Sequence, residues 1–211
     1  MAITESVAEH LDLGVPPAPW HAQRDGLAEF ASWLSLVSGS LGKIGLDVML
    51  MSQNEVGELS EGGGPGTGRG GSSSMPQKAN PVRSEALVTL ARFTAGLVST
   101  MHHALLQEHE RGGPGWRSEG MALPQMSCTA GGALARAGEL LDGLVVNTDR
   151  MRGNLDMTNG LVLAEAAMVA LAAHMPKPEA QALVKHASKV ALSENTHLID
   201  VLRRNCEITL D

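Results

Sequence analysis

The chain has 211 residues, of which 43% are hydrophobic and 18% charged, so it can bury a sizeable core and is not disordered overall. Aromatic residues make up only 2% of it, which disfavours a β-sandwich or barrel and favours an all-α fold. The formal charge of -7 leaves no basic surface for phosphates, so we expect no nucleic-acid partner.

Cysteine content and apolar runs indicate the compartment. Cys128 and Cys206 have neither metal-ligand nor disulfide-framework spacing, so reduced thiols in a cytoplasmic protein are expected. No run approaches the ~20 apolar residues that span a bilayer, and the N-terminus lacks the pattern of a secretory signal. We therefore predict a cytoplasmic protein without a membrane partner.

A long helix is predicted after Arg24, because prolines make the segment before it turn-like. Its apolar residues are spaced alternately three and four apart, which is the heptad pattern of a helix packed lengthwise against others. This predicted buried seam consists of Leu27, Phe30, Leu34, Val37, Leu41, Ile44, Val48 and Met51.

Residues 61–74 are dominated by glycine and serine, which predicts a mobile loop. A second helix is expected from Pro81 to about Gln107, and a third, with Pro124 in its first turn, to about Val146. The second helix presents Leu87, Leu90, Phe93, Leu97 and Met101 on one face. The three long helices should form an up-and-down array.

Shorter elements follow, so we predict two domains: a partial helical bundle over 1–146, carrying a loop at 61–81, and a small helical subdomain over 147–211. The expected elements of the second are a turn at 148–156 and helices over 161–174, from near Pro178, and over 196–204. The fold class is therefore an all-α long-helix bundle followed by a helical C-terminal subdomain.

The segment from Gly71 to Pro81, GSSSMPQKANP, places hydroxyls, an ammonium and an amide just before a helix. Serine and glycine there are also typical of a flexible linker with an N-cap. That reading does not explain Lys78 and Asn80, which we place in the first helical turn, where the dipole disfavours cations and attracts anions. A bound carboxylate would resolve the conflict.

The string G-S-S-x-M-P-x-K-x-N-P resembles the recurring motif of the fumarase/aspartase superfamily. The resemblance implies that Ser72 moves a proton at the carbon next to a carboxylate, although the neighbouring Ser73 stays an alternative. It further implies that Lys78 and Asn80 hold that carboxylate, and that Met75 is a substrate contact. No metal and no redox cofactor are implied.

Outside the loop the chain looks like one branch, the bacterial 3-carboxy-cis,cis-muconate cycloisomerases, on Gln107–Arg111 and Met151–Glu165. Adenylosuccinate lyases are the nearest alternative, but Gly120 stands where their phosphate-pocket arginine would fall. The implied reaction converts 3-carboxy-cis,cis-muconate to 4-carboxymuconolactone in protocatechuate breakdown (the beta-ketoadipate pathway). A related cycloisomerase acting on a sulfonated muconate stays open.

A small tricarboxylate substrate needs several cationic partners, and Lys78, Arg83, Arg111 and Arg24 are the candidates. Arg24 is equally readable as an ion-pair partner of its neighbours Asp25 or Glu29, and Arg83 as a solvated residue. Gln23 corresponds to a substrate-contacting glutamine of the adenylosuccinate lyase branch. His109 is more readily interpreted as bridging adjacent acidic residues.

Members of the superfamily are more than twice as long as this chain, and each of their active sites is assembled from three subunits of a homotetramer. The chain is therefore expected to correspond to the C-terminal half of such an enzyme, without its N-terminal half and the histidine carried there. A catalytically incomplete helical assembly module is the alternative from a different class.

Overall fold

The computed structural model describes residues 2–62, 75 and 79–205. The regular structure of these residues is helical except for two short strands, β1 (Leu59–Ser60) and β2 (Val145–Val146), which form a two-stranded sheet. The prediction of an all-α fold is confirmed. Contacts group the chain into a first unit, 1–50 with 60–145, and a second unit, 51–59 with 146–211. Our domain division at residue 146 stays a prediction.

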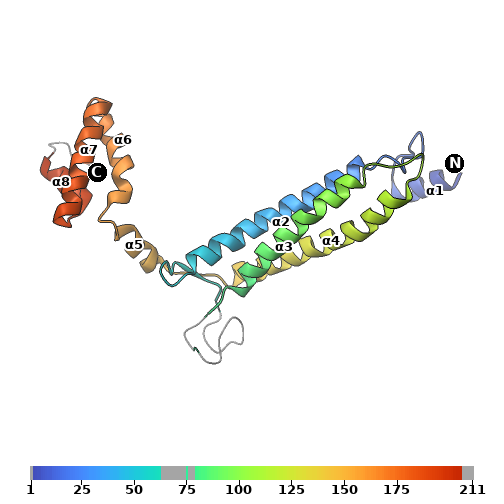
Figure 1. Cartoon of the computed structure of the whole chain (residues 1–211), viewed down its shortest axis with the longest axis horizontal. Coiled ribbons are helices and arrows are strands. Elements are labelled where there is room, and N and C mark those ends of the chain that lie inside the picture. The colour runs from blue at the N-terminus through green and yellow to red at the C-terminus, as the bar shows by residue number, and fades with distance from the viewer. Residues whose placement is uncertain (1, 63–74, 76–78, 206–211) are drawn as a thin grey trace. The chain divides into compact units, whose positions relative to one another are not determined.

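The first unit contains α1 (Ala2–Leu11) and the three long helices α2 (Asp25–Met51), α3 (Val82–His103) and α4 (Gly113–Asp142). The long helices lie side by side and alternate in direction, as predicted (Figure 1). One cluster of their buried core consists of Ala31, Leu34, Met101, Ala122, Met126 and Ala130. Helix α1 was not predicted.

The buried face of α2 differs from the predicted seam. Only Leu34 and Val48 of that seam are fully buried, whereas Phe30 and Ile44 are 44% and 36% exposed. The buried stripe consists mainly of small residues, namely Ala28, Ala31, Leu34, Ser38, Gly42, Gly45 and Val48. The seam prediction is therefore confirmed at Leu34 and Val48 and wrong at Phe30 and Ile44. The other four seam residues, Leu27, Val37, Leu41 and Met51, are partly buried.

The close approach of α3 explains this stripe. A Cβ at Gly42 would lie 2.5 Å from the Cβ of Ala91, and one at Gly45 would lie 2.8 Å from the carbonyl oxygen of Ser84. No larger side chain fits between backbones at that distance, so small residues occupy these positions of α2.

Two details of α3 and α4 also differ from the predictions. Helix α3 ends at His103 rather than near Gln107, and Phe93 is 47% exposed instead of lying on the buried face. Helix α4 begins 11 residues before Pro124, because Pro114 already occupies the first turn, where a proline costs little. Pro124 lies inside this 30-residue helix.

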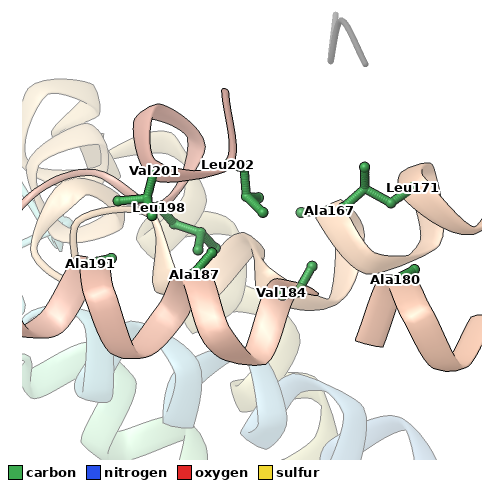
Figure 2. Packing of buried hydrophobic residues seen from close by; sticks show 9 residues of the cluster. All are labelled: Ala167, Leu171, Ala180, Val184, Ala187, Ala191, Leu198, Val201 and Leu202. Carbon is green, nitrogen blue, oxygen red and sulfur yellow. The ribbon is translucent and has the colours of Figure 1, made fainter. Parts of the chain in front are cut away.

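The second unit contains α5 (Thr148–Asp156), a 3₁₀ turn (Leu161–Leu163), α6 (Ala164–Ala172), α7 (Lys177–Glu194) and α8 (Leu198–Asn205). The predicted turn at 148–156 is wrong, because Asn147 caps a helix there: its side-chain oxygen accepts from the backbone N–H of Arg150 at 3.0 Å. The later helices are confirmed within a few residues. Figure 2 shows their core, which is formed by Ala167, Leu171, Ala180, Val184, Ala187, Ala191, Leu198, Val201 and Leu202.

Helix α2 is long and apolar enough to cross a membrane, with a mean hydropathy of 1.4 over its best window, of which 28% is buried. The bent pair formed by α5 and the segment 161–172 passes the same test only if the pair is counted as one span. The expectation that no such segment exists is therefore wrong by length and composition. The core helix of a bundle has the same composition, and α2 packs its small residues against α3.

Candidate active site

The predicted site residues form two groups. The second group is Gln23 and Arg111, and the first consists of the motif residues Ser72, Ser73, Met75, Lys78 and Asn80. Of these, Ser72, Ser73 and Lys78 lie outside the described residues. Met75 and Asn80 are described and both are exposed. Helix α3 begins at Val82, so Asn80 precedes the helix instead of lying in its first turn. The predicted placement of Asn80 in that turn is therefore wrong, and that of Lys78 lies outside the described residues.

A carboxylate does bind at the start of α3, but it belongs to the chain itself. Glu61 accepts hydrogen bonds from the backbone N–H groups of Arg83, at 3.0 Å, and of Ser84, at 2.7 Å. These amides have no partner within the helix, and the N-cap residue Pro81 supplies no side-chain cap. Glu61 thus satisfies the helix dipole that we expected a substrate to satisfy.

Further contacts hold the start of the loop against the bundle. The Arg83 guanidinium donates to the backbone carbonyl of Glu61 at 3.1 Å and lies 3.8 Å from the Glu139 carboxylate. Gly62 has a φ of 67°, and a Cβ there would overlap the carbonyl oxygen of Gly143. Only glycine fits this position, since it needs both a left-handed backbone and free space.

The second group, Gln23 and Arg111, belongs to the end of the bundle where α2 and α4 begin and α3 ends, whereas Asn80 lies just before α3 begins, at the other end of that helix (Figure 1). Gln23 directly precedes the 27-residue α2, whereas Asn80 lies near the other end of that helix. A rise of 1.5 Å per residue separates the two ends by about 40 Å. One copy of the chain therefore does not bring the two groups together.

At that far end, Arg24 forms a bidentate pair with Glu119 across 95 residues of sequence, and not with Asp25 or Glu29 as considered above. The side chains are 12% and 6% exposed. Hydrogen bonding to Glu119 raises the pKa of Arg24, an effect that burial opposes and the charge of Glu119 reinforces. The pair closes one side of an open pocket of about 630 Å³.

Aromatic and cationic side chains occur together beside this pocket. The Arg111 guanidinium lies 5.1 Å from the ring centroid of Trp116, which lines the pocket together with Arg117. His109 is exposed and has a φ of 52°. No three of the described His, Cys, Asp and Glu side chains are placed to hold a metal ion.

Sequence reasoning missed Glu61 and Glu119, and it also missed the anchors in α5. Asn154 donates to the carbonyl of Val56, at 2.9 Å, and to the Glu58 carboxylate, at 2.7 Å. Arg150 donates to the carbonyls of Val56 and Glu55, each at 2.9 Å. Asn154 lies within Met151–Glu165, the segment on which the resemblance was partly based, and this was the one signal in the sequence that pointed to it.

The chain is similar to a family of lyases and to several known cycloisomerases. Residues 2–96 match the family described as Lyase. The 3-carboxy-cis,cis-muconate cycloisomerase of Pseudomonas aeruginosa is 46% identical over 211 residues, which is 100% of this chain and 46% of that protein. The enzyme of the same name from Pseudomonas putida is 45% identical over 211 residues, 100% of this chain and 50% of that protein.

A crystal structure of the 3-carboxy-cis,cis-muconate lactonizing enzyme from Pseudomonas putida is 43% identical and has a TM-score of 0.81, over 94% of this chain and 43% of that chain. A fumarate lyase from Mesorhizobium sp. BNC1 is 38% identical with a TM-score of 0.80, over 95% of this chain and 43% of that one. The chain thus spans about half the length of the curated relatives it matches.

The chain shares with these relatives a set of long antiparallel helices, and in its sequence a serine- and lysine-containing motif precedes one of them. The chain belongs to the fumarase/aspartase superfamily.

Proposed function

We propose that the chain supplies part of the active site of a 3-carboxy-cis,cis-muconate cycloisomerase. The observation that carries this proposal is the 46% identity over 211 residues to an enzyme of that name. In the reaction, one carboxylate of the substrate adds across a double bond and gives 4-carboxymuconolactone. The substrate is thus a small tricarboxylate, formed in the breakdown of protocatechuate.

The loop at 61–81 carries the chemistry in this proposal. Addition of the carboxylate leaves an enediolate on the neighbouring carboxyl group, and a proton is then transferred to the adjacent carbon. Ser72, or Ser73 beside it, moves this proton. Lys78 and Asn80 bind the carboxyl group that becomes the enediolate, so they stabilise the intermediate more than the substrate. Met75 belongs to the same motif and lies against the substrate.

We propose further that the complete site combines residues from more than one copy, in a homotetramer. The separation of about 40 Å between Gln23 and Asn80 supports this, because one chain cannot bring both to one substrate. Large apolar side chains exposed on α2, such as Phe30, Trp33 and Leu36, offer surface for such an assembly. The free, exposed thiol of Cys128 fits a cytoplasmic enzyme.

The test is the loss of muconate absorbance with purified chain, run beside Ser72→Ala and Ser73→Ala and with adenylosuccinate as the competing substrate. A second protein, in which these 211 residues replace the matching half of the Pseudomonas putida enzyme, supplies the parts that the chain lacks. We expect turnover of the muconate that Ser72→Ala abolishes without loss of helical circular dichroism. Turnover of adenylosuccinate alone, or full activity of both the Ser72→Ala and the Ser73→Ala variants, would contradict the proposal.

A further inference from the structure

In the sequence the motif lies between Glu61 and the start of α3, and the structure brings Glu61 to that start. The two carboxylate oxygens of Glu61 accept from the amides of Arg83 and Ser84, and its carbonyl accepts from the Arg83 guanidinium. Residues 22 and 23 positions apart are thereby held together.

These contacts fix the backbone immediately after Asn80. The N–H of Val82 donates to the carbonyl of Asn80 at 2.9 Å, and the N–H of Glu85 donates to the carbonyl of Pro81 at 2.9 Å. Ser84 is fully buried, so its position in the bundle is fixed as well. A carboxylate that orients the amides of residues 83 and 84 therefore also orients the turn from Asn80 into the helix.

The chemistry of the capping group favours a positioning role. A carboxylate accepts two N–H groups at once, and hydrogen bonds to a charged acceptor are about twice as strong as neutral ones. The negative charge also lies at the positive end of a 22-residue helix dipole. Glu61 thus occupies the anion-binding position at the N-terminus of the helix. A substrate carboxylate is therefore bound by the side chains that precede the helix.

We propose that Glu61 is a positioning residue, which acts on the reaction by fixing Asn80 where it binds the substrate carboxylate. This inference rests on the function proposed above for Asn80. Glu61 itself touches neither the substrate nor the transferred proton.

The first test needs no activity. In nuclear magnetic resonance spectra of the 211-residue chain, Glu61→Ala should speed amide exchange at Arg83 and Ser84 by at least about 10-fold, the factor expected for hydrogen bonds to a charged group. It should also shift the side-chain amide signals of Asn80. Glu139→Ala is the matched control, because it removes an ionic partner of Arg83 and leaves both amide contacts in place. Unchanged exchange and unchanged Asn80 signals in Glu61→Ala would overturn the inference.

The second test separates positioning from a merely structural role. The variants are made in the hybrid enzyme described above, with the muconate as substrate. The kcat of Glu61→Ala should fall about 10-fold at a temperature where the variant is fully folded. Glu61→Gln, which keeps one acceptor oxygen, should recover part of the lost kcat. In the Asn80→Ala background the same change should cost less than about twofold, because a residue that acts through Asn80 loses its effect there. Additive effects would show that Glu61 acts otherwise. A hybrid enzyme that carries the wild-type 211 residues and shows no turnover would count against the proposed function, and the exchange experiment would still decide on Glu61.

Discussion

We predict that Gly→Ala substitution changes the free energy of unfolding in opposite directions at two glycines of α2, because only one of them belongs to the stripe of small buried residues. Gly45→Ala adds a Cβ that would lie 2.8 Å from the carbonyl oxygen of Ser84 and 2.9 Å from the Cβ of Leu87. Gly39→Ala adds the same atom where nothing lies within 4 Å. Both changes gain the same helix propensity, so the comparison isolates packing.

The expected magnitudes follow from those distances. Alanine is favoured over glycine in a helix interior by about 1 kcal/mol, so Gly39→Ala should stabilise the first unit by up to that amount. Overpacking a tight contact costs about 1–3 kcal/mol, so Gly45→Ala should be neutral or destabilising by up to about 2 kcal/mol. The difference between the two variants should be about 1–3 kcal/mol.

The assay uses the natural fluorescence of the chain. All three tryptophans, Trp20, Trp33 and Trp116, lie in the first unit, so urea unfolding followed by tryptophan emission reports on that unit alone. Equal unfolding midpoints and slopes for the two variants would refute the close packing of α2 against α3.

Two further predictions concern single hydrogen-bonded partners. Glu119→Ala leaves the partly buried Arg24 guanidinium without its partner and should cost about 1–3 kcal/mol by the same urea assay. The exposed Asp47→Ala, which also breaks an ion pair, should cost less than about 1 kcal/mol; equal losses would show that burial of the Arg24 pair is unimportant. Asn147→Ala removes the cap of α5 at Arg150 and should cost about 1 kcal/mol, seen as roughly fivefold faster amide exchange over 148–156; unchanged exchange would argue against the cap.

The existence and length of α2 could be predicted from sequence, but its buried face could not. Helical spacing is a property of neighbouring residues, so the apolar positions from Leu27 to Met51 were sufficient to predict a long helix. The face that is buried depends on how closely another helix approaches. That distance is set here by Gly42 and Gly45, which a search for large apolar residues passes over.

The candidate site divides in the same way. The motif around Asn80 is contiguous in sequence, so its chemistry could be predicted without a structure. The pairs Glu61 with Arg83 and Arg24 with Glu119 join residues 22 and 95 positions apart, and no local pattern specifies them. The predicted start of α4 was wrong for a related reason. Pro114 and Pro124 are both compatible with the first turn of a helix, and the local sequence does not decide between them.

The contacts of Glu61 and Gly62 also affect how this part of the chain can vary. Both ends of the motif-bearing segment are fixed to the bundle, at Glu61 on one side and at Arg83 and Ser84 on the other. Insertions between these anchors leave the register of α2 and α3 unchanged, and doubling a loop's length costs only about 0.6 kcal/mol in closure entropy. The length of the stretch between Gly62 and the motif that begins at Gly71 can therefore change, and tags or reporter groups can be inserted there without refolding the helices.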